Sequence, residues 1–494
     1  MGSQDVVALR SKTGVPVKPF GHQWREDFLF DPEWHNLNHG SYGTYPLAIR
    51  DKLRAYQDQG EARPDQFLRF REPKLLDASR AAVASLINAP LDTVVFVGNA
   101  TEGVNTVLRN LVWGDADDGS GSGSRPDVVF SFSTAYEACA KAVDYLAEYH
   151  GSAKLEHREI PLQYPVEDAD IVRAFREAVR RVRQDEGKRA RLAMFDVVSS
   201  RPGVVFPWEE LVAACRELGV LSLVDGAQGI GMVPLEHLTD ADPDFFVSNC
   251  HKWLHVPRGC AFLYTPLRNQ HLIRTTVATS HGFVPRSAQQ QRTNPLPPRE
   301  GGNAFTNNFA FVGTKDTAPY LCVKDAVAWR RDRCGGEDAI RAYLWDLNKR
   351  GVRLVAERLG TTFLDNAKGT MTNCAMGNVA LPVLIVDDGE DEREGDSSGG
   401  GGTTQGSSNS SSVKNETAKS TDVPVARKHQ GRLFQWVAET LVGDYKTFVS
   451  QFMIGNRYWV RISAQIYLEL KDYELAADVL TSLCERIKNK EYLE

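Results

Sequence analysis

The chain contains 494 residues, of which 42% are hydrophobic and 25% are charged. These fractions are close to globular averages, so a sizeable core can be buried, and the collagen, coiled-coil and wholly disordered classes are excluded. At roughly 150 residues per domain, the length allows about three domains, or one large enzyme unit with a smaller companion. The net charge of −6 gives no electrostatic footprint for nucleic acid or an anionic membrane, so neither is expected as a partner.

Neither a membrane-spanning segment nor a secretory leader is predicted. No run of 18 apolar residues occurs, and the first 20 residues lack an apolar core region. The eight cysteines are dispersed, and no CxxC pair is present, which predicts reduced thiols rather than disulfides or a zinc site. We therefore expect a cytoplasmic protein without a bound metal ion.

In the middle of the chain, short apolar strands alternate with helical patterns. The candidate strands are residues 93–97, 127–132, 191–196, 220–225, 244–248 and 259–264. They are rich in Val, Phe and Leu, as strands buried on both faces should be. A helix is predicted over 207–218, because Pro207 suits a first helical turn and Gly219 ends the pattern. This alternation predicts an α/β fold with a mostly parallel sheet flanked by helices.

The region after about residue 335 opens with helical patterns and then alternates strands (379–386 and 458–462) with amphipathic helices, the last over 470–487. It predicts a smaller α+β domain. Residues 387–425 interrupt this region and are predicted to be a disordered surface insertion, because 387–396 holds seven acidic residues and 397–412 contains only Gly, Ser, Thr, Asn and Gln. A smaller surface insertion is predicted over 114–127.

Ligands of open α/β sheets bind beyond the carboxyl ends of the strands, so the residues that follow each strand are the first candidates for a site. Strand 93–97 is followed by the small residues of 98–103 and a helical pattern. The free N–H groups and positive dipole end of such a helix suit a phosphate, with Thr101 adding a hydroxyl, although an ordinary helix cap has the same pattern.

Two further strands end in ionisable residues. Strand 220–224 is followed by Asp225, and a buried acid is costly unless it meets a cation such as a protonated pyridine nitrogen or caps the next turn. Strand 244–248 leads into Asn249, His251 and Lys252. A desolvated lysine has a lowered pKa and forms Schiff bases with carbonyls such as that of pyridoxal phosphate (PLP), whereas a lone lysine is more often a solvated surface charge.

Together, and in this order along the chain, these sites resemble those of the fold-type I PLP enzymes, specifically the class V aminotransferase superfamily. The resemblance extends over nearly the whole chain, from LNHGSYG at 37–43 to RIS at 461–463. LNHGSYG, NCHKW at 249–253 and GTKD at 313–316 resemble the isopenicillin N epimerase-like branch, near which the fungal ergothioneine-pathway C–S lyases belong. The resemblance implies the PLP-dependent transferase fold type I, with a seven-stranded sheet in the large domain.

The resemblance also implies a role for each matching residue. Lys252 would carry the cofactor and move the substrate Cα proton, and Asp225 would keep the pyridine nitrogen protonated. Tyr136, just after strand 127–132, would stack on the pyridine ring and supply a proton. The remaining cofactor contacts would come from Gln228 and Ser200 at the phenolic oxygen, and from Ala100, Thr101, Asn249 and His251 at the phosphate.

Arg461 lies in the apolar segment WVRIS, where a guanidinium needs a partner. A bidentate carboxylate is the best one, and the family places here the arginine that binds the substrate carboxylate; an internal ion pair is the alternative. Asn38, Ser41 and Tyr42 would line the substrate entrance. Thr314 would reach the phosphate from a neighbouring subunit, which implies a homodimer with shared active sites.

The implied domains are an N-terminal segment (1–45) joining the small domain and the substrate entrance, a large PLP-binding domain (46–330), and a small domain (331–494) that contains the insertion. The implied reaction is β-elimination at a C–S bond, with an amino-acid substrate. For the ergothioneine pathway this would be hercynylcysteine sulfoxide, a cysteine S-conjugate sulfoxide, yielding a sulfenic acid, pyruvate and ammonia.

Three other functions are compatible with the sequence. One is an amino-acid epimerase of the isopenicillin N type, and another is a non-catalytic PLP-fold binding protein, against which the presence of Lys252, Asp225 and Arg461 argues. A cysteine desulfurase would need a nucleophilic cysteine shortly before the carboxylate-binding arginine. Between Phe434 and Arg461 there is none, and Cys374 is interpreted as a small apolar filler.

Overall fold

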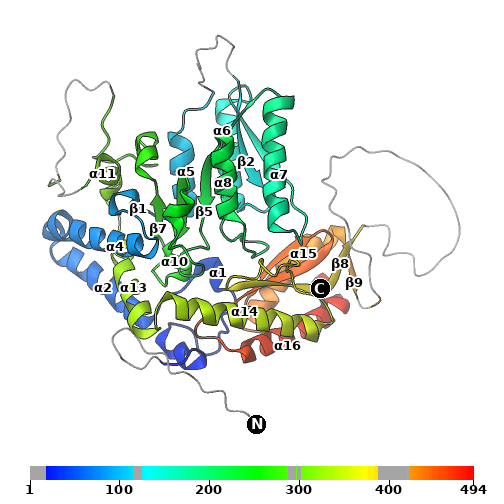
Figure 1. Cartoon of the computed structure of the whole chain (residues 1–494). Coiled ribbons are helices and arrows are strands. Elements are labelled where there is room, and N and C mark those ends of the chain that lie inside the picture. The colour runs from blue at the N-terminus through cyan, green and yellow to red at the C-terminus, as the bar shows by residue number, and fades with distance from the viewer. Residues whose placement is uncertain (1–17, 115–124, 287–295, 298–301, 388–419, 421) are drawn as a thin grey trace.

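The computed structural model describes residues 18–114, 125–286, 296–297, 302–387, 420 and 422–494. It contains two sheets, one in a larger α/β unit and one in a smaller unit beside it (Figure 1). Most of the predicted insertion over 387–425, and residues 115–124 of the smaller one, lie outside the described residues. No helix in the described part of the chain is long and apolar enough to cross a membrane.

The larger sheet has seven strands and confirms the predicted α/β fold class. All neighbouring strands are parallel except at β7, which is antiparallel to both β1 and β6. In spatial order the strands are β1 (Val94–Val97), β7 (Ala261–Tyr264), β6 (Phe245–Asn249), β5 (Leu221–Asp225), β4 (Arg189–Asp196), β2 (Asp127–Phe132) and β3 (Leu155–Ile160). The six candidate strands match six of these within a few residues. The edge strand β3 was missed because its sequence, LEHREI, is mostly polar.

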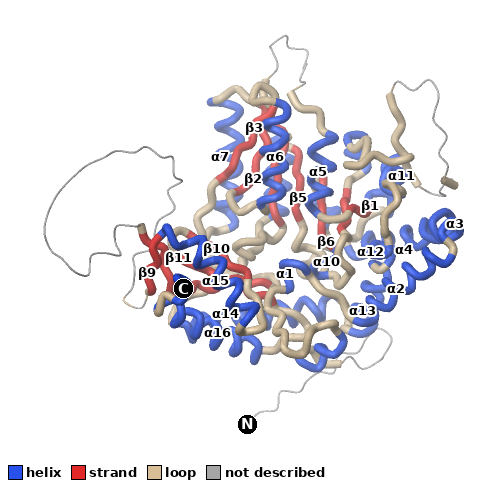
Figure 2. The backbone as a smooth tube through the Cα atoms, turned by 180° about the vertical axis from the view of Figure 1, so that it is seen from behind, coloured by secondary structure: helices blue, strands red, loops and turns tan. Residues whose placement is uncertain are grey.

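Helices cover both faces of this sheet, as the ribbon and tube views show (Figures 1 and 2). α5 (Ala100–Asn110) and α6 (Glu137–His150) pack their apolar residues into one core, and α4 (Glu72–Leu86), α7 (Asp168–Arg180) and α8 (Trp208–Leu218) pack theirs into the other. α8 matches the predicted helix and ends at Gly219, whose φ of 58° is left-handed. Strands buried between two helical layers explain the continuous apolar runs in the sequence.

The smaller sheet has the order β10 (Ser450–Ile454), β11 (Arg457–Ser463), β8 (Met376–Val386) and β9 (Val423–Ala426). α14 (Glu337–Leu359) and α16 (Leu470–Lys488) pack against β8 and against each other. The two helices can approach closely because Gly351 of α14 has no Cβ, which would clash with the Tyr473 ring of α16. α15 (Gln430–Gly443) completes the unit.

The prediction that the whole of 387–425 is disordered was wrong at its C-terminal end. Residues 423–425 belong to β9, which pairs in parallel with β8. The preceding Asp422 forms a buried ion pair with Arg457, at 2.9 Å. A composition window cannot resolve this boundary, because three strand residues and one buried acid directly follow a long polar tract.

The N-terminal segment crosses from one unit to the other. Gly21 N–H donates to the Ile466 carbonyl, and Ser463 N–H donates to the Leu37 carbonyl. α1 (His39–Tyr42) packs against α10 (Cys250–Trp253), which follows β6 (Figure 1). The remaining α-helices are α2 (Leu47–Ala62), α3 (Pro64–Gln66), α9 (Leu238–Ala241), α11 (Ala304–Ala310), α12 (Ala318–Leu321) and α13 (Val323–Arg333).

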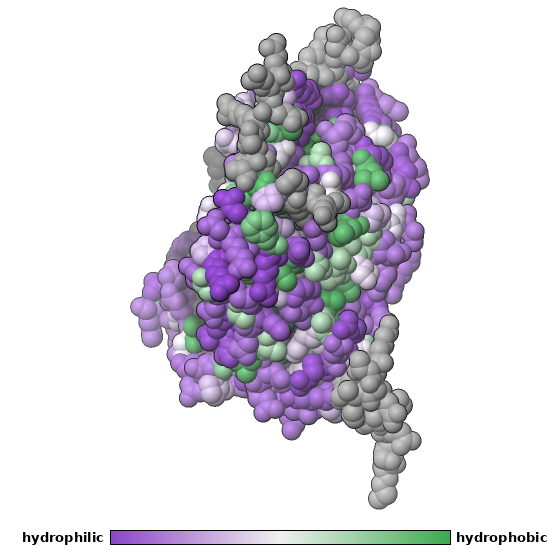
Figure 3. All heavy atoms as spheres, turned by 90° about the vertical axis from the view of Figure 1, so that its left-hand side faces the viewer, coloured by the Kyte–Doolittle hydropathy of each residue, from purple (hydrophilic) through white to green (hydrophobic). Residues whose placement is uncertain are grey.

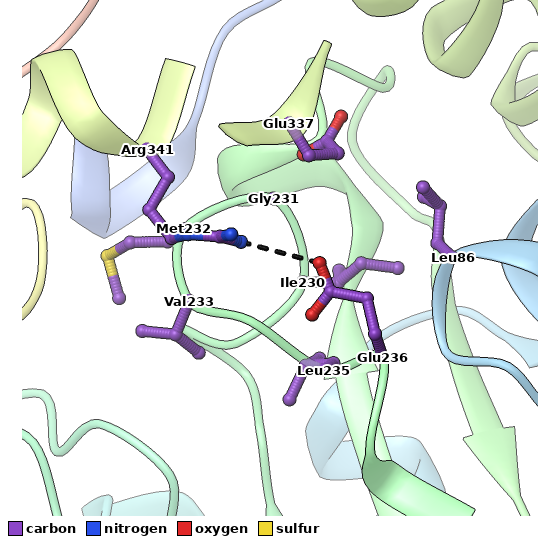
Figure 4. Close-up of a pocket in the computed structure, with 9 residues that line it drawn as sticks. All are labelled: Leu86, Ile230, Gly231, Met232, Val233, Leu235, Glu236, Glu337 and Arg341. Carbon is purple, nitrogen blue, oxygen red and sulfur yellow. Dashed lines mark ion pairs between the residues drawn. The ribbon is translucent and has the colours of Figure 1, made fainter. Parts of the chain in front are cut away.

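A small pocket lies where the N-terminus of α14 meets the loop after β5 (Figure 4). Its volume is about 20 Å³, enough for about one water molecule. Arg341 and Glu236 form an ion pair at 3.6 Å at its edge, while Met232 and Val233 give it an apolar wall (Figure 4). We interpret this pocket as a packing defect between the two units rather than a binding site.

Candidate active site

Lys252 lies in the single helical turn of α10, directly beyond the carboxyl end of β6. Its side chain is largely enclosed, and its Nζ makes no hydrogen bond or ion pair with any described residue. Burial lowers the pKa of Lys252 to about 8, and the nearby Asp225 carboxylate partly opposes this. At a pKa of about 8, roughly a tenth of the amine is neutral at pH 7, far more than at the ordinary 10.5, and the neutral amine is the nucleophile.

Two carboxyl groups lie side by side at the ends of the neighbouring strands. Asp225 ends β5 and Asp196 ends β4, and the two are register partners, so their side chains project from the same face of the sheet. They are 3% and 5% exposed, and neither forms an ion pair within the described part of the chain. Burial raises the pKa of both, and the charge of Asp225 raises that of Asp196 further.

The N-terminus of α5 faces the same region. Asn99 caps this helix by accepting a hydrogen bond from Glu102 N–H at 2.8 Å. The Ala100 amide, predicted to hold a phosphate, donates to Asn249 Oδ1 at 2.9 Å, so these two predicted phosphate contacts bind each other. Thr101 lies in the same first turn, half-buried. The helix end therefore offers its dipole and the remaining first-turn groups to an anion.

His251 adjoins Lys252 and has a fixed ring orientation. Its Nδ1 lies 2.8 Å from the Cys260 carbonyl oxygen, to which it donates, so Nε2 is the atom left for a ligand. Burial lowers the pKa of His251 to about 4. The ring is therefore neutral at pH 7, and a bound phosphate dianion would favour its protonation and donation from Nε2.

Gln228 is buried and held at both ends of its amide. Its Nε2 donates to the Gly40 carbonyl at 2.8 Å, and its Oε1 accepts from Trp253 Nε1 at 2.7 Å. One amide hydrogen remains for a cofactor oxygen. The second residue predicted at the phenolic oxygen, Ser200, instead contacts Arg461, which donates to the Ser200 carbonyl at 2.6 Å.

Arg461 is a buried guanidinium without a compensating negative charge among the described residues. It lies in β11, is 1% exposed, and has no carboxylate partner among the described residues. Its Nη2 donates to Asn38 Oδ1 at 3.0 Å and to Ser41 Oγ at 2.9 Å, while its Nε is buried without a partner. Burial lowers its pKa to about 10. The alternative of an internal ion pair therefore does not apply within this part of the chain.

The structure brings most of the predicted residues together, but the side chains of Tyr42, Tyr136 and Thr314 form no hydrogen bond or ion pair with this group. Asn38 and Ser41 contact Arg461 directly, as described above. Tyr42, in the same helical turn, is 70% exposed, and Tyr136, at the N-terminus of α6, is 43% exposed. Thr314 lies on an exposed loop before α12.

Two residues of the site were missed in the sequence. Asp196 ends an apolar strand just as Asp225 does, so the same sequence pattern indicates a site residue at both positions. His39 lies within LNHGSYG, and its Nε2 is 2.7 Å from the backbone carbonyl of Lys252, while its Nδ1 is 3.0 Å from Tyr467 Oη. Burial lowers the pKa of His39 to about 3, so it is a neutral hydrogen-bonding group behind the lysine.

These residues fit PLP. The two buried carboxyls form no ion pair in the described part of the chain and would favour a protonated ring nitrogen, and the α5 N-terminus with His251 would favour the phosphate. Lys252 has an amine with a lowered pKa and no partner among the described residues, which suits reaction with the aldehyde. In the described part of the chain, no group of three His, Cys, Asp or Glu side chains could hold a metal ion.

Comparison with known proteins identifies the family. The family model for class V aminotransferases matches residues 143–331. The chain is 34% identical, over 485 residues, to the L-cysteine desulfhydrase-like protein lolT1 of Epichloe uncinata, covering 96% of this chain and 98% of that protein. It is 27% identical to the hercynylcysteine sulfoxide lyase of Schizosaccharomyces pombe, covering 94% and 98%.

Solved structures agree in fold. A cystine C–S lyase, C-DES, in complex with cysteine persulfide matches with a TM-score of 0.64 and 16% identity, over 92% of this chain and 98% of that one. A cysteine desulfurase from Thermococcus onnurineus matches with a TM-score of 0.66 and 16% identity, over 95% and 99%. The chain belongs to the class V aminotransferase family. It is a PLP-dependent enzyme of the type that these C–S lyases and desulfhydrases represent.

Proposed function

We propose that this enzyme catalyses β-elimination at the C–S bond of a cysteine S-conjugate, with hercynylcysteine sulfoxide as its substrate. With one water molecule consumed to hydrolyse the released enamine, the products would be a sulfenic acid, pyruvate and ammonia. Its relatives support a C–S bond as the target, since their names are those of desulfhydrases and a sulfoxide lyase. The observation that carries the proposal is the buried, carboxylate-free guanidinium of Arg461.

Arg461 would bind the substrate α-carboxylate. Its position is fixed by Asn38, Ser41 and the Ser200 carbonyl, so little side-chain entropy would be lost on binding. A carboxylate would gain charge-assisted hydrogen bonds in a buried site, where they are strong. The carboxylate would also supply an acceptor for the Arg461 Nε, which is buried without a partner.

Lys252 would move the substrate Cα proton. PLP, when bound, supplies an electron sink that makes this proton acidic. The lowered pKa of Lys252, about 8, matches a base that works near neutral pH. His39, through its contact with the Lys252 carbonyl, would hold the helical turn that carries this lysine, and Asp225 with Asp196 would stabilise positive charge at the ring nitrogen.

The leaving group determines the last part of the proposal. As the C–S bond breaks, its electron pair leaves with sulfur. A sulfoxide releases a sulfenate, which leaves more readily than the thiolate of a thioether because its oxygen carries the charge. Tyr136, at the partly exposed start of α6, would orient this oxygen and donate its phenolic proton. Tyr42, exposed in α1, would lie at the substrate entrance.

A persulfide-forming desulfurase mechanism finds no support in this structure. Cys374 is fully buried, its Sγ lies 3.1 Å from the Met376 carbonyl oxygen, and burial raises its thiol pKa to about 12. A nucleophilic cysteine has a lowered pKa and is accessible, so Cys374 is unsuited to attack a substrate sulfur. The other seven cysteines are buried as well.

We also propose a homodimer in which Thr314 of one subunit contacts the cofactor phosphate of the other. Thr314 is exposed, as a residue directed to a partner would be. The face that lies at the left of Figure 1 is mostly hydrophilic, but hydrophobic side chains gather in one band across it (Figure 3). A band of this kind suits a subunit interface.

The test is a comparison of three substrates with purified, PLP-loaded enzyme. Hercynylcysteine sulfoxide, its thioether and L-cysteine would be followed for pyruvate, ammonia and sulfide. We expect kcat/KM to be highest for the sulfoxide. Sulfide from L-cysteine at a higher kcat/KM would replace the proposed substrate with cysteine, and inversion at Cα without pyruvate would replace elimination with epimerisation.

A further inference from the structure

A second cavity lies at the opposite edge of the large sheet, beyond the amino ends of β4 and β5. Its volume is about 450 Å³, which is within the range of small-molecule sites. At about 3.3 Å per residue, Arg191 in its wall is on the order of 16 Å along β4 from Asp196 in the candidate active site. The cavity is therefore separate from the PLP site.

Five arginines line this cavity, against two carboxylates, Asp242 and Asp244. Three of the arginines are neutralised. Arg189 forms an ion pair with the buried Asp127, and Arg216 and Arg268 both pair with Asp242. The other two, Arg183 and Arg191, form no ion pair or hydrogen bond with any described residue. The cavity thus contains an uncompensated positive charge.

The backbone of β4 directs one of these two arginines into the cavity. Val128 pairs with Ala190 and Val129 pairs with Leu192, so Arg191 is the extra residue of a β-bulge. Pairing with β5 begins only at Leu192, so Arg191 is paired on neither side. A bulge re-aims a side chain, and these features often occur at binding sites. The Nε of Arg191 is buried without a partner.

This arrangement is costly without a ligand. Burial and the charge of Arg189 lower the pKa of Arg191, with only partial compensation from Asp127. An arginine that merely stabilised the fold would be expected to reach the carboxylates nearby, as Arg268 does with Asp242 and Asp244. Val212 and Val220 add an apolar wall beside the charged groups.

We propose that this cavity is a binding site for a small oxyanion-bearing molecule, held by Arg191 and Arg183. Planar guanidinium groups bind phosphates and carboxylates bidentately. The volume exceeds that of a lone inorganic anion and accommodates an organic body against Val212 and Val220. The site does not depend on the function proposed for the PLP centre.

The experiment uses the PLP-loaded enzyme, so that the cofactor occupies its own phosphate site. Binding of inorganic phosphate, AMP and citrate would be measured by calorimetry and by the shift in melting temperature. The variants are Arg191→Gln and Arg183→Gln, with Arg181→Gln as the matched control, because Arg181 is exposed on the same helical segment but does not line the cavity.

We expect at least one probe to bind, and Arg191→Gln to weaken it roughly ten- to a hundredfold, which is the effect of removing a charged hydrogen-bond donor. Arg183→Gln should weaken probe binding less, since the Arg183 side chain is exposed. If Arg191→Gln does not fold, the loss of binding in Arg183→Gln tests the proposal. AMP binding more tightly than phosphate and citrate would identify a phosphorylated ligand with an organic body, and citrate binding most tightly would identify a polycarboxylate. The proposal fails if no probe binds below about 10 mM, or if Arg181→Gln weakens binding as much as Arg191→Gln.

Discussion

Replacing Arg461 with methionine should strongly weaken substrate binding without unfolding the protein. Methionine has a similar length but no charge, so the variant removes the donors to the substrate carboxylate. Two charge-assisted hydrogen bonds, at roughly 1.5–3 kcal/mol each, contribute about 3–6 kcal/mol, so kcat/KM should fall by a factor of about 10² to 10⁴. The loss should appear mainly in KM if the carboxylate is bound equally in ground and transition states.

The free energy of unfolding of Arg461→Met should differ little from that of the wild type, because two effects of the substitution oppose each other. Burial holds the pKa of Arg461 near 10 rather than its ordinary 12.5, which disfavours the charged form by roughly 3 kcal/mol at about 1.4 kcal/mol per pKa unit. Removing the charge relieves this penalty. It also leaves the Ser200 carbonyl and Asn38 Oδ1 with one donor fewer, which costs about 1–3 kcal/mol. The free energy of unfolding should therefore change by less than about 2 kcal/mol.

Arg457→Met is the matched control. Arg457 lies four residues earlier in β11 and is also buried, but it pairs with the buried Asp422. Removing one partner of a buried ion pair costs roughly 3–5 kcal/mol, so this variant should be clearly less stable than Arg461→Met. Steady-state kinetics of the PLP-loaded enzymes would measure kcat/KM, and denaturant unfolding would measure the free energy of unfolding. An Arg461→Met variant that is strongly destabilised, with kcat/KM within tenfold of the wild type, would refute the assignment of Arg461 to the substrate.

Four further predictions concern the cofactor site and Cys374. The rate at which PLP attaches to the apoenzyme, followed by absorbance, should rise with pH about a midpoint near 8, because only the neutral amine of Lys252 reacts; a midpoint near 10.5 would contradict its burial. In Asp225→Asn that midpoint should move lower, since the Asp225 charge raises the pKa of Lys252. Asp196→Asn should raise the melting temperature of the apoenzyme at pH 7, because an acid whose pKa is raised in the folded state destabilises that state above its ordinary pKa; the gain should vanish near pH 3. The same variant should bind PLP roughly tenfold or more weakly, and an unchanged PLP affinity would exclude Asp196 from the site. Cys374→Ala should retain kcat within about twofold, and a loss above a hundredfold would restore a nucleophilic role.

Several features of the fold could be predicted because they are local. A strand buried on both faces must be apolar throughout, so β2 and β5 were placed within one residue at each end. α8 was found from its apolar face and the glycine that ends it. β3 and β9 were not found. The edge strand β3 is mostly polar, and β9 is a short segment that depends on β8 and on the Arg457–Asp422 ion pair.

In the candidate site, too, the features that depend on neighbouring residues could be predicted, and those that depend on distant contacts could not. Asp225 and Lys252 follow predicted strands, so their place at the sheet edge follows from chain order alone. The partners of Gln228 and Arg461 could not be predicted, because Gly40, Asn38 and Ser41 lie about 190 and 420 residues away in the sequence. The pairing of Asp196 with Asp225 required the register of β4 against β5.

The sequence by itself determined the class of fold, and it placed the predicted cofactor motifs, with Lys252 as the proposed reactive lysine, in order along the chain. These depend on short-range patterns, in which a strand, a turn and one ionisable residue are neighbours in the chain. The tertiary structure alone decided which charges are compensated. Arg457 and Arg461 lie in the same apolar strand, yet one meets a buried carboxylate and the other meets none. Whether a buried charge has a partner depends on contacts between distant segments, and in this protein that difference separates a structural arginine from the proposed substrate-binding one.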